Sequence, residues 1–163
     1  MKIKFIIAED FVNYKKPSMF IGFPNCSFKC DKECGCAVCQ NSALTQAPTF
    51  DVGIERIVSY FVDNEITEAV ICGGLDPFDS WDDLLSLVLL LRYRTPEPIV
   101  IYTGYNEDEI QDKLDILKYY ENIVVKFGRF IPDRPKRFDE LLGVELASDN
   151  QYAKSISLDA WLV

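Results

Sequence analysis

The sequence predicts an α/β fold, a partial, open βα barrel of parallel strands. Short apolar segments rich in β-branched residues alternate along the chain with longer amphipathic segments, and several of the apolar segments end directly in glycine. This alternation favours parallel βα units with right-handed crossovers. There are too few such units for a complete eight-stranded barrel, so an open arrangement is expected.

The expected elements follow in order from the N-terminus. Strands are expected at 2–8, 18–23, 67–72, 99–102, 123–127 and 155–158. Helices are expected at 51–62, with Asp51 as its cap, at 80–92 and at 107–120. The segment 24–41 is expected to be an irregular loop because of its Pro, Gly, Asn and Asp, and 131–144 to be weakly structured.

Composition indicates one soluble domain over residues 1–163. Seventeen Lys and Arg against twenty-six Asp and Glu give a net charge of −9, which argues against nucleic-acid binding. No apolar run approaches the roughly 18 residues that a membrane span requires, so a cytoplasmic protein with no membrane partner is expected. The absence of histidine excludes Ser-His-Asp and Cys-His nucleophiles and any histidine base.

Five of the six cysteines lie in the segment 24–41, at positions 26, 30, 34, 36 and 39. In a reducing compartment such a group more often holds a metal or an iron–sulfur centre than disulfides. No second cysteine pair follows downstream to complete a zinc ribbon. An iron–sulfur cluster held by fewer than four protein thiolates keeps one iron open for another ligand. A structural zinc and inert thiols are the alternatives.

Four loops are expected at one edge of the sheet. The cysteine loop, Gly73-Gly74, Gly104 and Gly128 each follow an expected strand. Because parallel strands end at the same edge, these loops should meet at the carboxyl edge, where α/β folds place their sites.

Further motifs produce a resemblance to a known family. Cys26-x3-Cys30 resembles the start of the radical S-adenosylmethionine (SAM) signature, and five motifs occur in the order seen in anaerobic ribonucleotide reductase activating proteins. These motifs are Cys39-Gln40-Asn41, Gly73-Gly74-Leu75-Asp76-Pro77, Tyr102-Thr103-Gly104-Tyr105, Phe127-Gly128-Arg129-Phe130-Ile131 and Ala147-Ser148-Asp149-Asn150-Gln151. The resemblance extends from about Pro17 to Gln151.

The resemblance implies a glycyl radical enzyme activase. In that family a reduced 4Fe-4S cluster cleaves SAM to methionine and a 5′-deoxyadenosyl radical, which abstracts hydrogen from a glycine of the partner reductase. The implied partners are an anaerobic ribonucleotide reductase and a flavodoxin- or ferredoxin-type electron donor. Cluster and SAM carry the chemistry, so no catalytic side chain is expected.

The same resemblance implies the cluster ligands Cys26, Cys30 and Cys39, with 31–36 as an insertion within the loop. Cys34 is the alternative third ligand, because eight residues separate Cys30 from Cys39 and the strict family spacing is absent. Cys34 and Cys36 would otherwise be spare thiols, forming a resolving pair or a second metal site.

The implied SAM contacts come from several loops. Val38 would lie against the adenine beside Cys39 and Gln40, and Gly73-Gly74 would hold the amino group with Asp76 near by. Thr103 would line the SAM or substrate side of the sheet, and Lys126 and Arg129 would bind the SAM carboxylate or an acidic partner. The alternatives are a plain turn at Gly73-Gly74, and core packing or surface charge at the other positions.

A polar pair near the C-terminus and two rival functions are also considered. Asn150-Gln151 could dock an extended peptide. The rivals are a radical SAM enzyme that acts on a small molecule and a non-catalytic zinc or iron–sulfur binding module.

Overall fold

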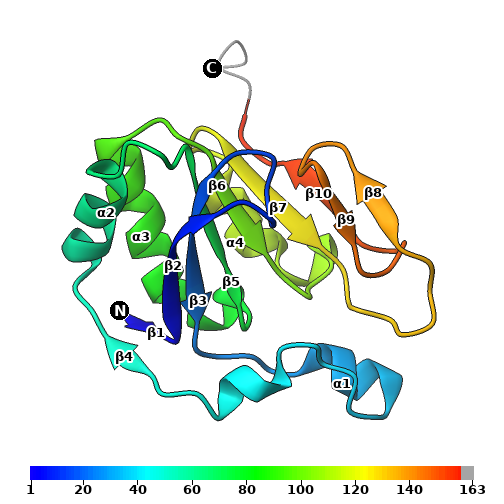
Figure 1. Cartoon of the computed structure of the whole chain (residues 1–163). Coiled ribbons are helices and arrows are strands. Elements are labelled where there is room, and N and C mark those ends of the chain that lie inside the picture. The colour runs from blue at the N-terminus through cyan, green and yellow to red at the C-terminus, as the bar shows by residue number, and fades with distance from the viewer. Residues whose placement is uncertain (159–163) are drawn as a thin grey trace.

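The computed structural model describes residues 1–158, and six strands form its main sheet in the order β10-β7-β6-β5-β3-β2 (Figure 1). These strands are β2 (Phe5–Asp10), β3 (Ser18–Phe23), β5 (Ala69–Gly74), β6 (Ile99–Tyr102), β7 (Ile123–Phe127) and β10 (Tyr152–Ser155). The four inner strands are mutually parallel, whereas β2 and β10 pair antiparallel at the two edges.

Three α-helices cover one face of the sheet. They are α2 (Ile54–Val62), α3 (Trp81–Arg94) and α4 (Gln111–Leu117), and the short 3-10 helices η1 (Ser42–Thr45), η2 (Pro77–Ser80) and η3 (Glu107–Glu109) lie in the connections. Strands β3, β5, β6 and β7 are added in one direction along the sheet, so crossovers of one hand place every helix on the same side. The main core fills the space between these helices and the sheet.

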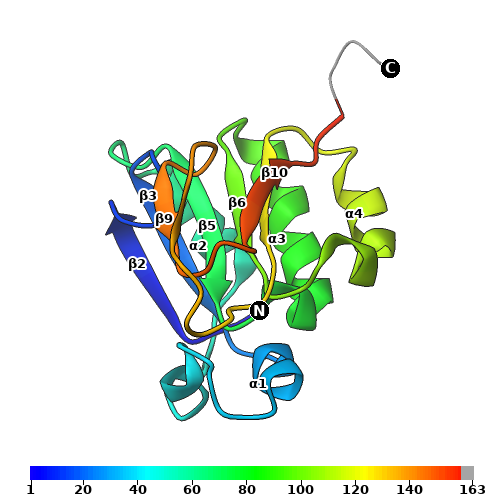
Figure 2. The ribbon, with the colours of Figure 1, turned by 90° about the vertical axis from the view of Figure 1, so that its right-hand side faces the viewer.

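The strands alternate between two buried faces, as period-two geometry requires. In β7, Val125 packs in the helix-side core, while Val124 belongs to a smaller core on the opposite face. That opposite face is covered by the hairpin of β8 (Arg137–Asp139) and β9 (Val144–Leu146). Figure 2 shows α3 and α4 on one side of the strands, with β9 away from them.

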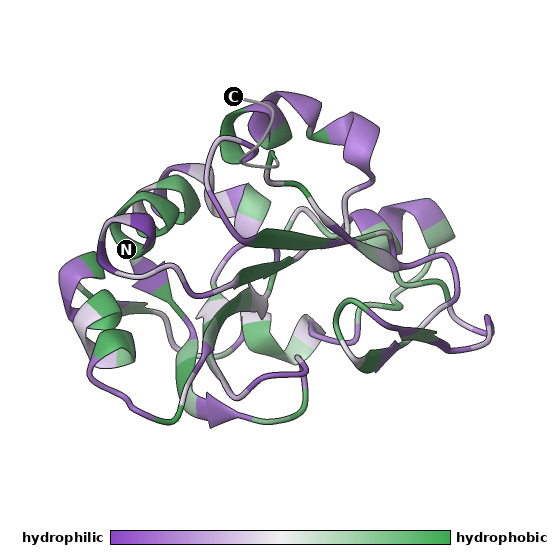
Figure 3. Cartoon of the chain, turned by 90° about the horizontal axis from the view of Figure 1, so that it is seen from above, coloured by the Kyte–Doolittle hydropathy of each residue, from purple (hydrophilic) through white to green (hydrophobic). Residues whose placement is uncertain are grey.

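Burial on both faces explains the composition of the inner strands. Strands enclosed on both sides are near-continuous apolar runs, and in Figure 3 the central strands have the hydrophobic colour while the helices are banded green and purple. The apolar bands of the helices pack on the sheet. Within residues 1–158, every helix is too short or too polar to cross a bilayer.

Many of the expected elements are confirmed. Strands 18–23, 99–102 and 123–127 have the expected bounds, and the expected parallel βα units are present. The sheet is open in the described part of the chain, and a barrel-like curvature stays a prediction.

Five expectations about elements are wrong. The helix expected at 107–120 is divided into η3 and α4 and ends at Leu117. The first strand is split into β1 (Lys2–Ile3) and β2, and the terminal strand ends at 155 rather than beginning there. Asp51 does not cap α2, because β4 (Phe50–Asp51) pairs with β1 and Gly53 is the cap. The cysteine loop contains a helix, α1 (Lys29–Cys34), which lies beyond the lower end of the sheet in Figures 1 and 2.

Candidate functional site

A cavity of about 590 Å³ lies where the parallel strands end, on the face of the sheet away from the helices. Its walls are the cysteine loop, the ends of β5, β6 and β7, and strand β9. The four loops expected at the carboxyl edge of the sheet therefore do meet. Phe20, Val144 and Leu146 give part of the wall an apolar lining.

Three cysteines line this cavity, namely Cys26, Cys30 and Cys39. Cys34 and Cys36 do not line it, and both are exposed. All six cysteines are free thiols. The structure thus brings together the three thiols expected as ligands and leaves the alternative third ligand outside.

Asp31 explains how Cys39 reaches the cavity across the insertion. Its Oδ1 atom accepts hydrogen bonds from the backbone N–H groups of Val38 and Cys39, both at 2.8 Å. These two bonds close the loop between residues 31 and 39. They bring Cys39 close to Cys30, which directly precedes Asp31 in the chain. Sequence reasoning missed this residue, since an Asp after a cysteine gives no sign of a partner eight positions away.

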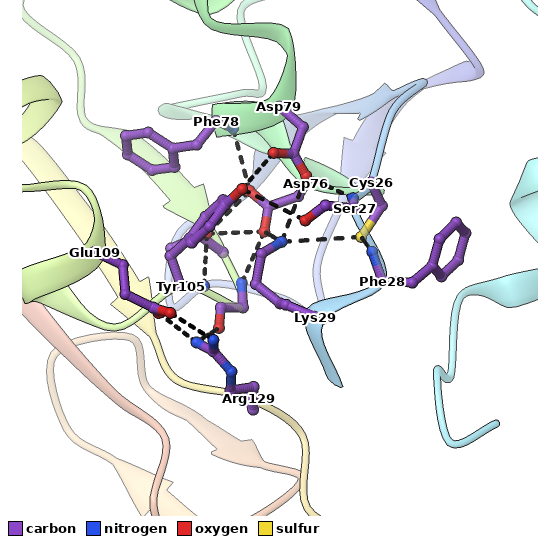
Figure 4. A network of polar contacts seen from close by, with 12 residues as sticks. Cys26, Ser27, Phe28, Lys29, Asp76, Phe78, Asp79, Tyr105, Glu109 and Arg129 are labelled. Carbon is purple, nitrogen blue, oxygen red and sulfur yellow. Dashed lines mark hydrogen bonds and ion pairs between the residues drawn. The ribbon is translucent and has the colours of Figure 1, made fainter. Parts of the chain in front are cut away.

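A buried ion pair, shown in Figure 4, is formed by two residues that line the cavity. Lys29 Nζ lies 2.8 Å from Asp76 Oδ2 and 3.4 Å from Asp79 Oδ2. The Lys29 ammonium also lies 3.8 Å from the centre of the Tyr105 ring and donates at 4.0 Å to Cys26 Sγ. Burial lowers the pKa of Lys29, but the Asp76 carboxylate more than offsets this and the pKa is raised overall.

The Asp76 carboxylate is fully engaged within the protein. Besides Lys29, it accepts hydrogen bonds from Thr103 Oγ1 at 2.9 Å, from Gly104 N at 3.0 Å and from Phe78 N at 3.1 Å. Asp76 and Thr103 were both expected as SAM contacts, and in the structure they are bonded to one another. Lys29 was not singled out from the sequence, because its two carboxylate partners lie about fifty positions away.

A protein-family model described as "4Fe-4S single cluster domain" matches residues 18–151 of the chain. The chain belongs to this 4Fe-4S single cluster domain family. The match begins with β3, ends just before β10 and contains all six cysteines. Comparisons with curated proteins and with solved structures give no significant match.

The residues of this 4Fe-4S single cluster domain fit the cluster that its name implies. Three thiols in one cavity form a sulfur-only donor set, which is the usual ligation of iron–sulfur clusters. Within residues 1–158, no three Cys, Asp or Glu side chains converge closely enough to hold a single metal ion.

Cys26 and Cys39 must lose a proton to bind such a cluster, and their surroundings disfavour this loss. Burial raises the pKa of Cys26, while the N–H of Phe28 and the Lys29 ammonium oppose that rise. Burial likewise raises the pKa of Cys39. The cluster domain therefore holds these groups as thiols when they carry no ligand.

Lys4 and Lys126 are buried lysines that have no ion pair within residues 1–158, and of these two only Lys126 lines the cavity. It lies two residues after Val124 on β7, on the same face of the sheet, and so faces the cavity rather than the helices. Its Nζ donates at 3.4 Å to the Gly128 carbonyl. Burial lowers the pKa of Lys126 to about 8, because the charged form is poorly solvated there.

We expect Lys126→Met to stabilise the protein when it holds no cluster. The folded pKa lies below the ordinary 10.5, so below about pH 8 the folded state carries a charge that it disfavours. The variant should raise the free energy of unfolding by about 1–3 kcal/mol at pH 7. The gain should shrink as the pH rises from about 8 to about 10.5, where the amine of the unfolded chain also loses its proton. Denaturant unfolding at several pH values measures it.

Lys136→Met is the matched control, since the Lys136 side chain is 69% exposed. It should change the free energy of unfolding by no more than about 0.5 kcal/mol at any of these pH values. An equal gain from both variants, or a gain at Lys126 that does not depend on pH, would contradict the assignment.

The remaining site residues expected from the sequence divide into two groups. Gln40 and Gly74 line the cavity, whereas Val38 and Gly73 do not. Gly74 O accepts a hydrogen bond from Asn41 Nδ2 at 2.8 Å, which ties the cysteine loop to the end of β5.

Three polar residues near the cavity have partners within the domain. Arg129 pairs with Glu33 and Glu109. The amide groups of Asn150 and Gln151 donate to the carbonyls of Arg129 and Gly128, at 2.8 and 3.3 Å. These amides therefore join the segment before β10 to the segment after β7, and peptide docking by them stays a prediction.

Gly74→Ala should destabilise the cluster domain by about 1–3 kcal/mol. Gly74 has φ +81°, and a Cβ there would lie 3.0 Å from Gly22 Cα on the neighbouring strand. Gly53→Ala is the control, because its φ is −62° and the nearest atom is a flexible Glu55 oxygen at 3.8 Å. It should cost only a few tenths to about 1 kcal/mol as a helix-cap change. Equal costs in urea unfolding would show that the backbone conformation at Gly74 is unimportant.

Proposed function

We propose that this 4Fe-4S single cluster domain is a radical SAM activase that generates a glycyl radical on a partner enzyme. The observation that carries the proposal is the composition of one cavity. Cys26, Cys30 and Cys39 share it with Gly74, Asp76, Thr103 and Lys126 from the ends of the parallel strands. The three thiols thus face the same space as the Lys126 ammonium, which is suited to an amino-acid carboxylate, while Asp76 and Thr103 are bonded to one another.

Three thiolates leave one iron of a four-iron cluster without a protein ligand. When bound, a reduced cluster of this kind supplies one electron to SAM and so permits a 5′-deoxyadenosyl radical to form. Cys26, Cys30 and Cys39 would hold the cluster, and the Asp31 carboxylate fixes the backbone of Cys39.

Lys126 supports the binding of an amino-acid carboxylate in the cavity. The Lys126 ammonium is buried and has no ion pair within residues 1–158. An anion bound beside it, with water excluded, would form a strong charge-assisted hydrogen bond. The apolar wall formed by Phe20, Val144 and Leu146 limits the water around the reacting groups.

A protein substrate fits this chain better than a small one. The cavity is walled by one short hairpin and by loops, which leaves little material to enclose a small molecule. The proposed partner is a glycyl radical enzyme of the anaerobic ribonucleotide reductase type, and the proposed electron donor is a flavodoxin or ferredoxin. The acidic protein, with a net charge of −9, is poorly suited to nucleic acid.

The test is reductive SAM cleavage by protein reconstituted with iron and sulfide without oxygen. With a strong reductant present, 5′-deoxyadenosine and methionine should form in equal amounts, and the EPR signal of the reduced cluster should change when SAM is added. A cluster of confirmed iron content that yields no 5′-deoxyadenosine would reject the proposal. Adding the anaerobic reductase should then produce a glycyl radical signal, and its absence despite SAM cleavage would favour a small-molecule substrate.

A further inference from the structure

The two exposed cysteines, Cys34 and Cys36, form a pair outside the cavity. Cys34 Sγ and Cys36 Sγ lie 3.3 Å apart, and both residues are exposed. Cys34 is the last residue of α1, and Gly35 caps the helix with φ +73°. This left-handed residue turns the chain back, so that both thiols lie on one side of the turn.

The turn that carries these thiols is held at both ends. The Gly35 N–H donates to Asp31 O at 2.9 Å, and Glu33 pairs with Arg129. The Asp31 carboxylate fixes the chain just beyond Cys36 through Val38 and Cys39. The pair is therefore presented by a closed loop, and its geometry does not require a bound cluster.

A disulfide would need little movement of this loop. A sulfur–sulfur bond is about 2.05 Å long, so the two atoms must approach by about 1.3 Å, within reach of side-chain rotation. A Cβ built at Gly35 meets no atom within 4 Å, so the turn has free space around it. Cys34 and Cys36 do not line the cavity that contains the other three thiols of the loop, which disfavours exchange of partners with them.

We propose that Cys34-Gly35-Cys36 is a surface dithiol–disulfide exchange site that takes aliphatic disulfides of the glutathione class. One thiolate attacks the incoming disulfide and releases one small thiol, which leaves a mixed disulfide on the protein. The second thiolate then displaces the second small thiol and forms the internal Cys34–Cys36 bond. The protein pair is oxidised by two electrons, the small disulfide is reduced to two thiols, and the two protons leave with those thiols.

The neighbouring thiol makes the second step fast and the mixed disulfide short-lived. Its sulfur lies at contact distance, so the intramolecular attack competes well with any free thiol in solution. A short, exposed disulfide loop is also readily reduced. The site should therefore follow the ratio of disulfide to thiol around it, rather than remain locked in one state. The inference does not depend on the proposed radical chemistry.

The experiment uses two full-length proteins in oxygen-free glutathione buffers of graded composition. One is the cluster-loaded protein. The other is the variant Cys26→Ala/Cys30→Ala/Cys39→Ala, which keeps only Cys34, Cys36 and the buried Cys72. In both, oxidation should remove about 2 Da, abolish alkylation of Cys34 and Cys36 together and reverse with excess glutathione. Cys72 should react only after unfolding.

Single variants make the test decisive. Cys34→Ser and Cys36→Ser should each accumulate a stable glutathione adduct on the remaining thiol, and neither should lose 2 Da. Two free thiols at the highest disulfide ratio, or stable glutathione adducts on both cysteines of the pair, would overturn the inference. The cluster-free variant can pass this test even if the loaded protein fails to cleave SAM, so the two proposals fail separately.

Discussion

Cys39→Ala is expected to lose the cluster, whereas Cys34→Ala is expected to keep it. Cys39 lines the cavity with Cys26 and Cys30, and Cys34 lies outside it on the surface. Removing a cavity thiol leaves two sulfur ligands for a cluster that needs at least three. Iron and sulfide bound after anaerobic reconstitution should fall about tenfold or more for Cys39→Ala, with loss of the visible charge-transfer band.

Cys36→Ala is the matched control, since it removes a thiol from the same loop without touching the cavity. Both surface variants should bind iron and sulfide within experimental error of the parent protein. Loss of iron from Cys34→Ala with retention in Cys39→Ala would reverse the assignment of the third ligand. Asp31→Ala should give an intermediate loss, because it releases the backbone of Cys39 while leaving the thiol in place.

Asp76→Ala is expected to cost about 3 kcal/mol or more of folding free energy. It removes the nearest partner of the buried Lys29 ammonium and the acceptor for Phe78 N, Thr103 Oγ1 and Gly104 N. Breaking a buried pair by deleting one member typically costs about 3–5 kcal/mol. Asp79, at 3.4 Å from the same ammonium, should hold the loss near the lower end. Urea unfolding of the cluster-free protein gives the value.

Two amide variants separate charge from hydrogen bonding. Asp76→Asn keeps an acceptor but removes the charge, so it should cost less than Asp76→Ala. Asp79→Asn removes only the longer ion pair and should cost least. Adding Lys29→Met to Asp76→Asn should recover at least about 1 kcal/mol, since no unpaired cation then stays buried. Additive costs, or a loss at Asp76→Ala of about 1 kcal/mol or less, would show that the pair is not coupled as described.

This ion pair should contribute evenly across the neutral range. The pKa of Lys29 is raised above 10.5, so its stabilisation is complete below that pH and is lost only as the pH rises beyond it. Burial raises the pKa of Asp79, but hydrogen bonds from Tyr105 and Ser27 and the Lys29 charge lower it below 3.8 overall. Its stabilisation is present above that value and is lost as the pH falls further. The cost of Asp79→Asn should therefore be nearly constant from about pH 5 to 9.

Elements that depend on local pattern were predictable from the sequence. The buried strands 18–23, 99–102 and 123–127 have the expected bounds, because enclosed strands are continuous apolar runs bounded by turn residues. Elements that depend on pairing with distant parts of the chain could not be predicted from it. Asp51 has the side chain of a helix cap, yet the pairing of β4 with β1 takes it into a strand.

The chain by itself determined the chemistry that is available to this protein. Its sulfur-rich loop, its lack of histidine and the glycines after successive strands could be recognised without coordinates, and they placed an iron–sulfur site at the carboxyl edge of a parallel sheet. Local composition decides which metal-binding side chains exist and which strand or helix each of them follows in the chain.

Only the tertiary structure decided which of those donors meet. It brings Cys39 into the cavity and leaves Cys34 on the surface, it joins Lys29 to Asp76 across forty-seven positions, and it buries Lys126 without an ion pair in the described chain. The physical reason is that such contacts depend on how the loops are closed in space. A hydrogen bond such as that from Cys39 N to Asp31 leaves no periodic trace in the sequence.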